Sequence, residues 1–392
     1  MKDIVIVATA RTAGAKFGGA LQNLAATEFG AQLVRGMLAR SGIDPKVIEQ
    51  TVFGSAWQAG VGPNPARITA VNAGVPVDAP AVSVNVRCGS SLQALIFGAQ
   101  AIQAGDVRAV LVGGTESSSQ IPYALPGARW GYRMGASEII DLMHKDGFKC
   151  PLGGGLMGEL TDDLAKELDI TRKEQDQFAV ESHQKAAAAV AAGKFKDEVV
   201  AIEVPGKKGP TQFTEEEIVR TDASLEGMAK LKPVFRKDGG ITAANACALC
   251  DAAAAQVLMD AERARELGLK PVAKLKGYAF VGYEPKRFGL SPSKAIPAAL
   301  KKAGLQLKDM DLIELNEAFA AQYLACERAL GLDRAKVNVH GGAIALGHPV
   351  AATGSKILTT LIHALKDRNK SLGVASACIG GGNGAAVVIE RV

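Results

Sequence analysis

The chain has 392 residues, of which 48% are apolar and 22% charged, so it is neither a disordered chain nor a small disulfide scaffold. Its net charge of +5 is too small to indicate a nucleic-acid partner, and an aromatic share of 5% argues against a platform for stacking bases. No apolar run has the length of a membrane-spanning helix, and no signal peptide precedes the six cysteines. We therefore expect reduced thiols in a cytoplasmic protein without a membrane span.

The first 118 residues alternate apolar strands with helices. Strands are predicted at 4–8, 51–54, 81–86 and 109–112, and helices at 25–40, 66–73 and 90–104. The strands are continuous apolar runs, and short turns rich in glycine connect them to the helices. This pattern is typical of a mostly parallel sheet that is covered on both faces.

The middle of the chain has a different character. Residues 119–248 are rich in proline, glycine and scattered charge, with predicted helices at 161–168 and 171–192. The second helix begins with a capping box, Thr171 and Glu174. We interpret this stretch as an inserted domain whose end returns to the N-terminal half.

The last part repeats the first. A Val-Asn-Val run, a small-residue turn, a helix and a strand that ends in glycines occur at 84–114 and again at 337–382. Two similar α/β halves are therefore expected, residues 1–118 and 249–392, with a site where their equivalent turns meet.

A cysteine stands at the start of the predicted helix 90–104, in the run Val86-Arg87-Cys88-Gly89. The partial positive charge of a helix N-terminus lowers the pKa of a thiol and favours the thiolate, and the following glycine lets backbone approach a ligand. A reactive role for Cys88 competes with that of a buried structural cysteine.

Three runs of the second half place polar groups at strand ends and turns. His348 closes the run Gly-Gly-Ala-Ile-Ala-Leu-Gly-His, Asn316 precedes Glu-Ala-Phe, and Cys378 precedes Ile-Gly-Gly-Gly-Asn-Gly. Backbone N–H groups of such a glycine run can bind an oxyanion. Because ligands bind at the carboxyl ends of parallel strands, these groups are expected to share one site.

In this order and combination, the motifs resemble the thiolase family over essentially the whole chain. The resemblance implies an α/β thiolase fold: two similar halves with mixed sheets in layers of helix and sheet, plus an inserted loop domain that binds CoA. It implies thiolytic cleavage of 3-ketoacyl-CoA to acetyl-CoA and a shortened acyl-CoA, or Claisen condensation, as in fatty acid β-oxidation. Coenzyme A is then a substrate, and neither a permanently bound cofactor nor a metal is expected.

The resemblance also implies roles for five residues. Cys88 is the nucleophile that carries the acyl group as a thioester, and His348 takes its proton. Cys378 is the acid and base at the α-carbon. Asn316 fixes a water in one oxyanion hole, and the backbone amides of Cys88 and Gly380 form the other.

Substrate contacts follow from the same match. The residues expected to bind acyl-CoA or CoA are Arg220, Cys247, Leu249, Met157, Phe288 and Phe319. Several positions depart from the family pattern, with Phe288 for Met and Ser91, Ala248, Ala252 and Ala351 where glycine is usual. These departures predict a substrate other than simple acetoacetyl-CoA.

Two other functions fit parts of the pattern. A decarboxylating ketosynthase-type condensing enzyme shares the fold, although Cys378 in its glycine frame favours a thiolase. A thiolase-like subunit that acts only in a complex is the second alternative, whereas the family itself implies a homodimer or homotetramer. Cys247-x-x-Cys250 has no second pair to complete a zinc site, and it is predicted to open a helix of small residues.

Overall fold

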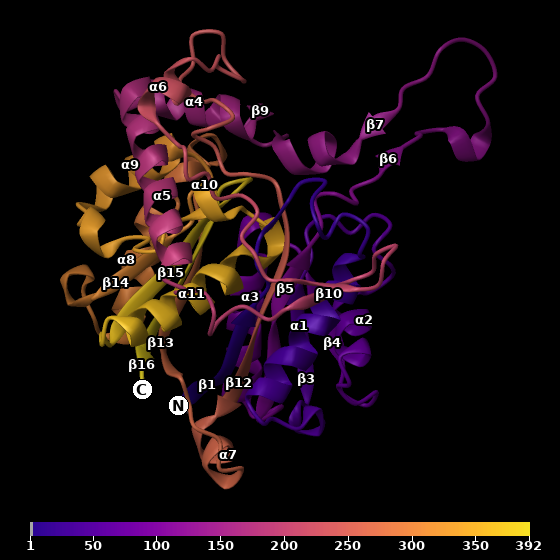
Figure 1. Ribbon diagram of the computed structural model, residues 1–392, viewed down its shortest axis with the longest axis vertical. Helices are drawn as coiled ribbons and strands as arrows, with labels where there is room; N and C mark the ends of the chain where they lie inside the picture. The colour runs from indigo at the N-terminus through magenta and orange to yellow at the C-terminus, as the bar shows by residue number, and fades with distance from the viewer. Residues whose placement is uncertain (1–2) are drawn as a thin grey trace.

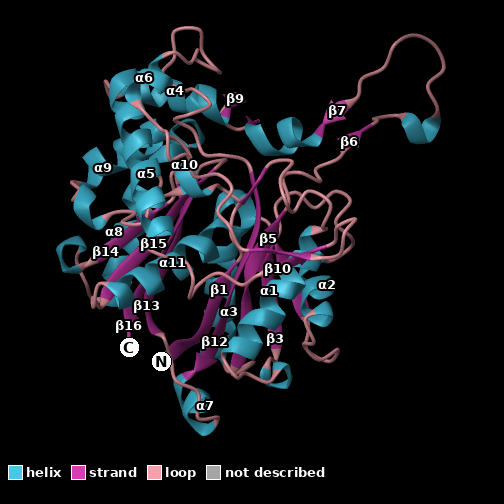
Figure 2. Ribbon diagram, viewed as in Figure 1, coloured by secondary structure: helices cyan, strands magenta, loops and turns pink. Residues whose placement is uncertain are grey.

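The computed structural model describes residues 3–392 and is built around a ten-stranded sheet with helices on its faces (Figures 1 and 2). Nine strands follow one another in the order β14-β15-β16-β13-β1-β12-β5-β3-β4, and β2 pairs with β12. Their bounds are β14 Leu312–Leu315, β15 Leu372–Ile379, β16 Asn383–Arg391, β13 Ala273–Gly282, β1 Ile4–Arg11, β12 Cys250–Asp260, β5 Ala109–Glu116, β3 Gln50–Gly54, β4 Ala81–Val84 and β2 Ala15–Lys16.

The strand order contains the predicted internal repeat. In the sheet, the strands of the first half follow the order β4-β3-β5-β12-β1, and those of the second half follow the order β14-β15-β16-β13. Val337 forms a parallel bridge with Ile313 of β14, so it lies beside β14 in the way that β4 lies beside β3. An antiparallel pair, β1 with β13, joins the halves, and Val5 lies opposite Lys274 there. The two halves therefore form one sheet.

Helices cover both faces of this sheet. In chain order they are α1 Ala26–Arg40, α2 Pro65–Asn72, α3 Ser90–Ala104, α4 Met157–Glu167, α5 Arg172–Ala191, α6 Leu225–Ala229, α7 Ala261–Glu266, α8 Pro292–Ala303, α9 Ala320–Leu330, α10 Ala343–Leu346 and α11 Thr353–Asp367. Successive side chains of β1 lie on opposite faces of the sheet. Ile6 packs in a cluster with residues of α3 and α11, and Val7 packs in a cluster with residues of α1.

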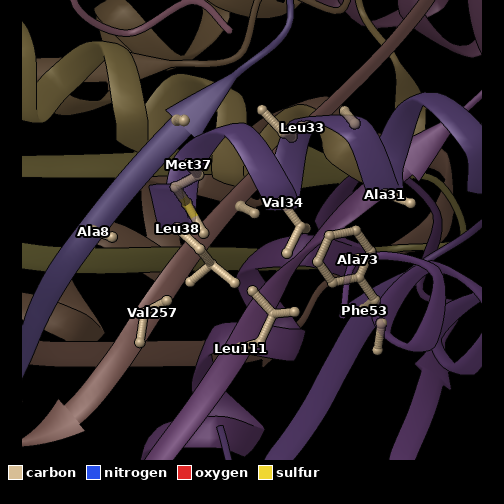
Figure 3. Packing of buried hydrophobic residues seen from close by; sticks show 14 of the residues in the cluster. Ala8, Ala31, Leu33, Val34, Met37, Leu38, Phe53, Ala73, Leu111 and Val257 are labelled. Atoms are coloured by element: carbon tan, nitrogen blue, oxygen red, sulfur yellow. The ribbon is translucent and has the colours of Figure 1, made fainter. Parts of the chain in front are cut away.

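The cluster on the α1 side is the core of the N-terminal half. Val34 and Leu38 of α1 point towards Phe53 of β3 and Leu111 of β5, as Figure 3 shows, and Leu33 and Met37 belong to the same cluster. These apolar residues recur at the spacing of one helix face, which is why the sequence predicts this helix well.

The cluster on the opposite face belongs to both halves. It holds Leu95 of α3, Leu361 of α11 and side chains of strands from each half, such as Val112 and Ala377. The two helices that follow Cys88 and His348 are thus packed against each other.

The inserted segment combines short hairpins with helices. Its paired strands are β6 Tyr123–Ala124 with β7 Ile140–Asp141, β8 Lys149–Cys150 with β9 Gly155–Leu156, and β10 Ile202–Val204 with β11 Thr211–Phe213. Helices α4 and α5 contact α9, and the arm that carries β6 and β7 stands away from the body (Figure 1). Thr171 caps α5 with Glu174, as predicted.

Two structural predictions are wrong. The alternation of strands and helices predicts a mostly parallel sheet, but only β3–β4, β3–β5 and β14–β15 are parallel among its neighbouring pairs, so the sheet is mixed, as the family resemblance implies. The small-residue run after Cys247 is not a helix but strand β12, which is buried along its whole length between β1 and β5. Alanine's helix propensity is weak beside the pairing available on both edges of this strand.

The position of β12 bears on the division of the chain. This strand lies within the N-terminal half although it follows residue 249, where the second half was expected to begin. We therefore propose that the C-terminal half begins after β12.

Candidate active site

The nucleophile turn connects β4 to α3 through a 3₁₀ turn, Arg87–Gly89. Arg87 has φ +52°, a left-handed conformation that is costly for a side chain with a Cβ. Its N–H donates to Asn85 Oδ1 at 3.1 Å, and its carbonyl accepts from Ser90 Oγ at 2.6 Å. These bonds hold the strained turn that presents Cys88 just before α3.

His348 reaches the same point from the second half. Its Nε2 lies 3.3 Å from Cys88 Sγ, and its Nδ1 lies 2.6 Å from Thr353 Oγ1. Gly347, with φ +83°, makes the turn that precedes it, and the His348 N–H donates to the Ala248 carbonyl at 3.0 Å. The structure therefore brings together the predicted nucleophile and its base.

Cys378 and Gly380 extend the site along the end of β15. Cys378 is fully buried and packs in one apolar cluster with Met157, Phe288 and Phe319. A Cβ on Gly380 would lie 2.9 Å from Met157 Sδ, so a larger residue there would displace the Met157 side chain. The backbone of Gly380 lies close enough to the Cys88 thiol to lower its pKa, and Gly380 lines the same cavity as Cys88.

Asn316 follows β14 and is buried. Its N–H donates to the Ser376 carbonyl at 2.9 Å, whereas neither polar atom of its side chain has a hydrogen-bond partner within residues 3–392. A buried amide ordinarily has partners, so this one is suited to hold a small polar molecule such as water.

A cavity of about 390 Å³ opens over Cys88. Its wall contains Ala56, Trp57, Gln58, Ala59, Asn85, Arg87, Cys88, Asp146, Gly147, Phe148, Met157, Cys247, Phe288, Ala318, Phe319, His348, Val350 and Gly380. Four aromatic rings make much of this wall apolar. Trp57 and Phe148 are not predicted from the sequence, because Trp57 lies in a loop and Phe148 at the end of a short π-helix, Met143–Phe148, and neither belongs to a motif.

Not every predicted residue lies on this wall. Cys378 and Asn316 lie outside it, and so do Leu249, which pairs with His348 through its backbone, and Arg220, which is exposed. The residues that stand where glycine is usual, Ser91 among them, do not line it either.

Burial determines the charge state of the reacting groups. It raises the pKa of the Cys88 thiol, against the lowering effects of the Arg87 charge and the Gly380 N–H. Burial, with the nearby Lys356 ammonium, lowers the pKa of His348 to about 3. The expected lowering of the Cys88 pKa by the helix N-terminus is thus outweighed in the free protein, and the pair is a neutral thiol and a neutral imidazole.

One further buried group, Glu116, supports the turns of the site. Glu116, at the end of β5, accepts N–H groups of Ala56, Trp57 and Ala351, so it ties the cavity wall to the turn after His348. Burial raises the pKa of Glu116 to about 7. A charged residue at the carboxyl end of a buried strand was the one sequence signal for it.

The second thiol is also kept protonated. Burial, and the proximity of a charge on Cys88, raise the pKa of Cys378 well above its usual range. Cys378 therefore carries a proton that it can donate to a carbanion.

A repeated α/β fold whose equivalent turns bring a cysteine and a histidine together is typical of thiolases and of the condensing enzymes that share their fold. The model of the thiolase N-terminal domain matches residues 4–262, and that of the C-terminal domain matches residues 269–391. The chain belongs to the thiolase family, and its enzymatic class is that of an acyltransferase. These matches favour a thiolase over the decarboxylating alternative.

Individual members of the family are similar to this chain over nearly their full length. An acetyl-CoA acetyltransferase of Chromobacterium violaceum is 47% identical over 99% of this chain and 100% of its own, and the beta-ketothiolase BktB of Cupriavidus necator is 45% identical over 100% of both. The crystal structure of human mitochondrial 3-ketoacyl-CoA thiolase is 38% identical, with a TM-score of 0.96 over 100% of this chain and 99% of its own.

We predict that alkylation of Cys88 by iodoacetamide accelerates with pH through one ionisation above the ordinary thiol pKa. Raising the pH removes the thiol proton, whereas His348 stays neutral and adds no inflection between about pH 5 and pH 8. Peptide mass spectrometry separates Cys88 from Cys247, with Cys88→Ser as the specificity control. A rate that stays high down to about pH 5 would show a thiolate–imidazolium pair and contradict this prediction.

Proposed function

We propose that this chain catalyses the CoA-dependent cleavage of 3-ketoacyl-CoA, and the reverse Claisen condensation, through an acyl group on Cys88. One observation carries the proposal: Cys88 Sγ lies 3.3 Å from His348 Nε2 on the wall of a cavity that also includes Gly380. A soft nucleophile that is also a good leaving group suits the repeated making and breaking of thioesters.

In the first step, His348 Nε2 takes the Cys88 proton, and the thiolate attacks the 3-keto carbon of the substrate. The bond between the α-carbon and that carbon then breaks, and its electron pair forms the enolate of acetyl-CoA. Cys378 donates its proton to the α-carbon, which releases acetyl-CoA and leaves an acyl group on Cys88.

In the second step, the thiol of free CoA gives its proton to the Cys378 thiolate and attacks the acyl carbon. The carbon–sulfur bond to Cys88 breaks, and the departing thiolate recovers its proton from His348. The enzyme returns to its starting protonation state, with a shortened acyl-CoA as product.

Two oxyanions form along this path. The Cys88 and Gly380 N–H groups would stabilise the one at the acyl carbon, and the lowering effect of the Gly380 backbone on the Cys88 pKa supports this assignment. A water held by Asn316, together with His348, would stabilise the enolate oxygen. The unpaired buried amide of Asn316 supports this assignment.

Substrate contacts are proposed on the same basis. Met157, Phe288 and Phe319 contact the acyl group, and Cys247 the pantetheine, because all four line the cavity. Leu249 would act through the backbone beside His348, and exposed Arg220 would meet the nucleotide end of CoA outside the cavity.

The cellular setting also remains a proposal. We propose a cytoplasmic enzyme of fatty acid metabolism, including β-oxidation, and the six free cysteines fit a reducing compartment. In residues 3–392 no helix is long and apolar enough to cross a membrane, and no cluster of three or more side chains is arranged to hold a metal.

The purified chain alone is expected to cleave a 3-ketoacyl-CoA when free CoA is added. Cys88→Ser should lower kcat by roughly 10³-fold or more, since it removes the nucleophile. Cys326→Ser, a buried cysteine away from the cavity, is the matched control and should retain activity. Activity that appears only with a second protein would favour the subunit alternative, and no CoA-dependent cleavage at all would overturn the proposal.

We expect the enzyme to prefer 3-ketoacyl-CoA substrates other than acetoacetyl-CoA, because aromatic side chains line the cavity. Steady-state kcat/KM across linear, branched and aromatic 3-ketoacyl-CoA substrates measures this preference. Phe288→Met should move the preference towards acetoacetyl-CoA by about 10-fold, the usual effect of a changed apolar contact. A sharp optimum at acetoacetyl-CoA in the unaltered protein would rule the idea out.

Self-association is expected through a second copy of the chain. Strand β4 has no neighbour on its outer edge within residues 3–392, and Val82 on it and Phe97 on α3 are exposed. Sedimentation should show a dimer or tetramer, and Val82→Lys should shift the population towards smaller species. A monomer at micromolar concentration would contradict this expectation.

A further inference from the structure

Thr353 is the first residue of α11 and the second neighbour of the His348 ring. Its hydroxyl oxygen lies 2.6 Å from His348 Nδ1 and 3.2 Å from the Pro349 carbonyl oxygen. The side chain is buried, with 1% of its surface exposed. The contact therefore lies out of the reach of bulk water.

The single hydroxyl proton of Thr353 determines the directions that we assign to its hydrogen bonds with Pro349 and His348. The Pro349 carbonyl can only accept, so it takes the single hydroxyl proton of Thr353. With the hydroxyl proton in the 3.2 Å bond to Pro349, the oxygen of Thr353 offers His348 a lone pair, and Nδ1 then supplies the proton of the 2.6 Å bond.

The consequence appears on the other side of the ring. A neutral imidazole carries one proton, so a proton on Nδ1 leaves Nε2 with a free lone pair. This lone pair faces Cys88 Sγ at 3.3 Å. Only in this tautomer can His348 accept the Cys88 proton.

We propose that Thr353 is the positioning residue that holds His348 in its Nδ1–H tautomer. In other catalytic triads an acidic or amide side chain orients the histidine, and here a hydroxyl has this role. The proposal rests on the assigned role of His348 as base. Thr353 touches no reacting atom and acts only through the ring.

The surroundings of the ring agree with this assignment. The Lys356 ammonium donates to the Leu346 and Gly347 carbonyls, so it fixes the chain before His348 and offers the ring no acceptor. The β-branched Thr353 is restricted about χ1, which keeps its hydroxyl in place.

The tautomer itself is the first measurement. In protein labelled with ¹⁵N-histidine, long-range ¹H–¹⁵N spectra distinguish the two ring nitrogens, and His348→Asn assigns the signal among the five histidines. We expect a protonated Nδ1 in the unaltered protein and in Thr353→Ser, and a loss of this preference in Thr353→Val. A protonated Nε2 in the unaltered protein would overturn the proposal whether or not the enzyme is a thiolase.

Kinetics provide the second measurement. Thr353→Val should slow acylation of Cys88 by about 10- to 100-fold, the usual effect of a misplaced catalytic group, whereas Thr353→Ser should restore most of the rate. Thr360→Val is the matched control, since Thr360 lies in the same helix and its hydroxyl bonds to Glu198 instead.

The outcomes separate a positioning role from a structural one. Equal losses of rate in Thr353→Val and Thr360→Val, with an unchanged His348 spectrum, would show that the hydroxyl only stabilises α11 and would overturn the proposal. If His348→Asn alone left CoA-dependent cleavage intact, the proposed function of His348 would fail instead.

Discussion

The close packing of α3 against α11 is the constraint on which the site depends. Cys88 and His348 are 260 residues apart in the chain, and each lies just before one of these helices. The apolar cluster that the helices share draws side chains from both halves of the sheet, and Ser91 Oγ accepts the Ser355 N–H at 2.9 Å near the helix starts. Any change that separates the helices also separates the thiol from its base.

The same burial sets the chemistry. A thiolate and an imidazolium taken out of water would each lose solvation, so the resting pair is neutral, and charge appears only when a substrate brings the carbonyl that can accept it. In the proposed mechanism, preorganised donors such as the Gly380 N–H stabilise that charge when it forms. The buried ionisable side chains Lys356 and Glu116 form hydrogen bonds with the backbone. Lys356 donates to two carbonyls before His348, and Glu116 accepts three N–H groups around the cavity.

Sequence reasoning found the reacting groups because their turns carry compact motifs, and the internal repeat placed the motifs in equivalent positions of two halves. It failed where tertiary contacts decide the outcome. The alanine-rich run became the buried strand β12, since a strand there completes hydrogen bonds to both β1 and β5. Trp57 comes from a loop and Phe148 from a short π-helix, and they come to line one cavity only in the folded chain. Thr353 could be named in a motif, but its bond to His348 depends on the turn between them.

The residues that depart from the family pattern fall into two groups according to their place in the fold, those away from the cavity and those that line it. Ser91 bonds to the start of α11 and Ala351 donates its N–H to Glu116, so both connect the two halves, whereas Ala252 is buried in β12 opposite β5. They do not touch the cavity, and the missing glycines therefore say little about the substrate. Phe288 and Cys247 do line the cavity, and any difference in acyl preference must arise through side chains of this kind. The scaffold and the specificity of the enzyme can thus vary separately, because the residues that hold Cys88 to His348 are not the ones that surround the acyl group.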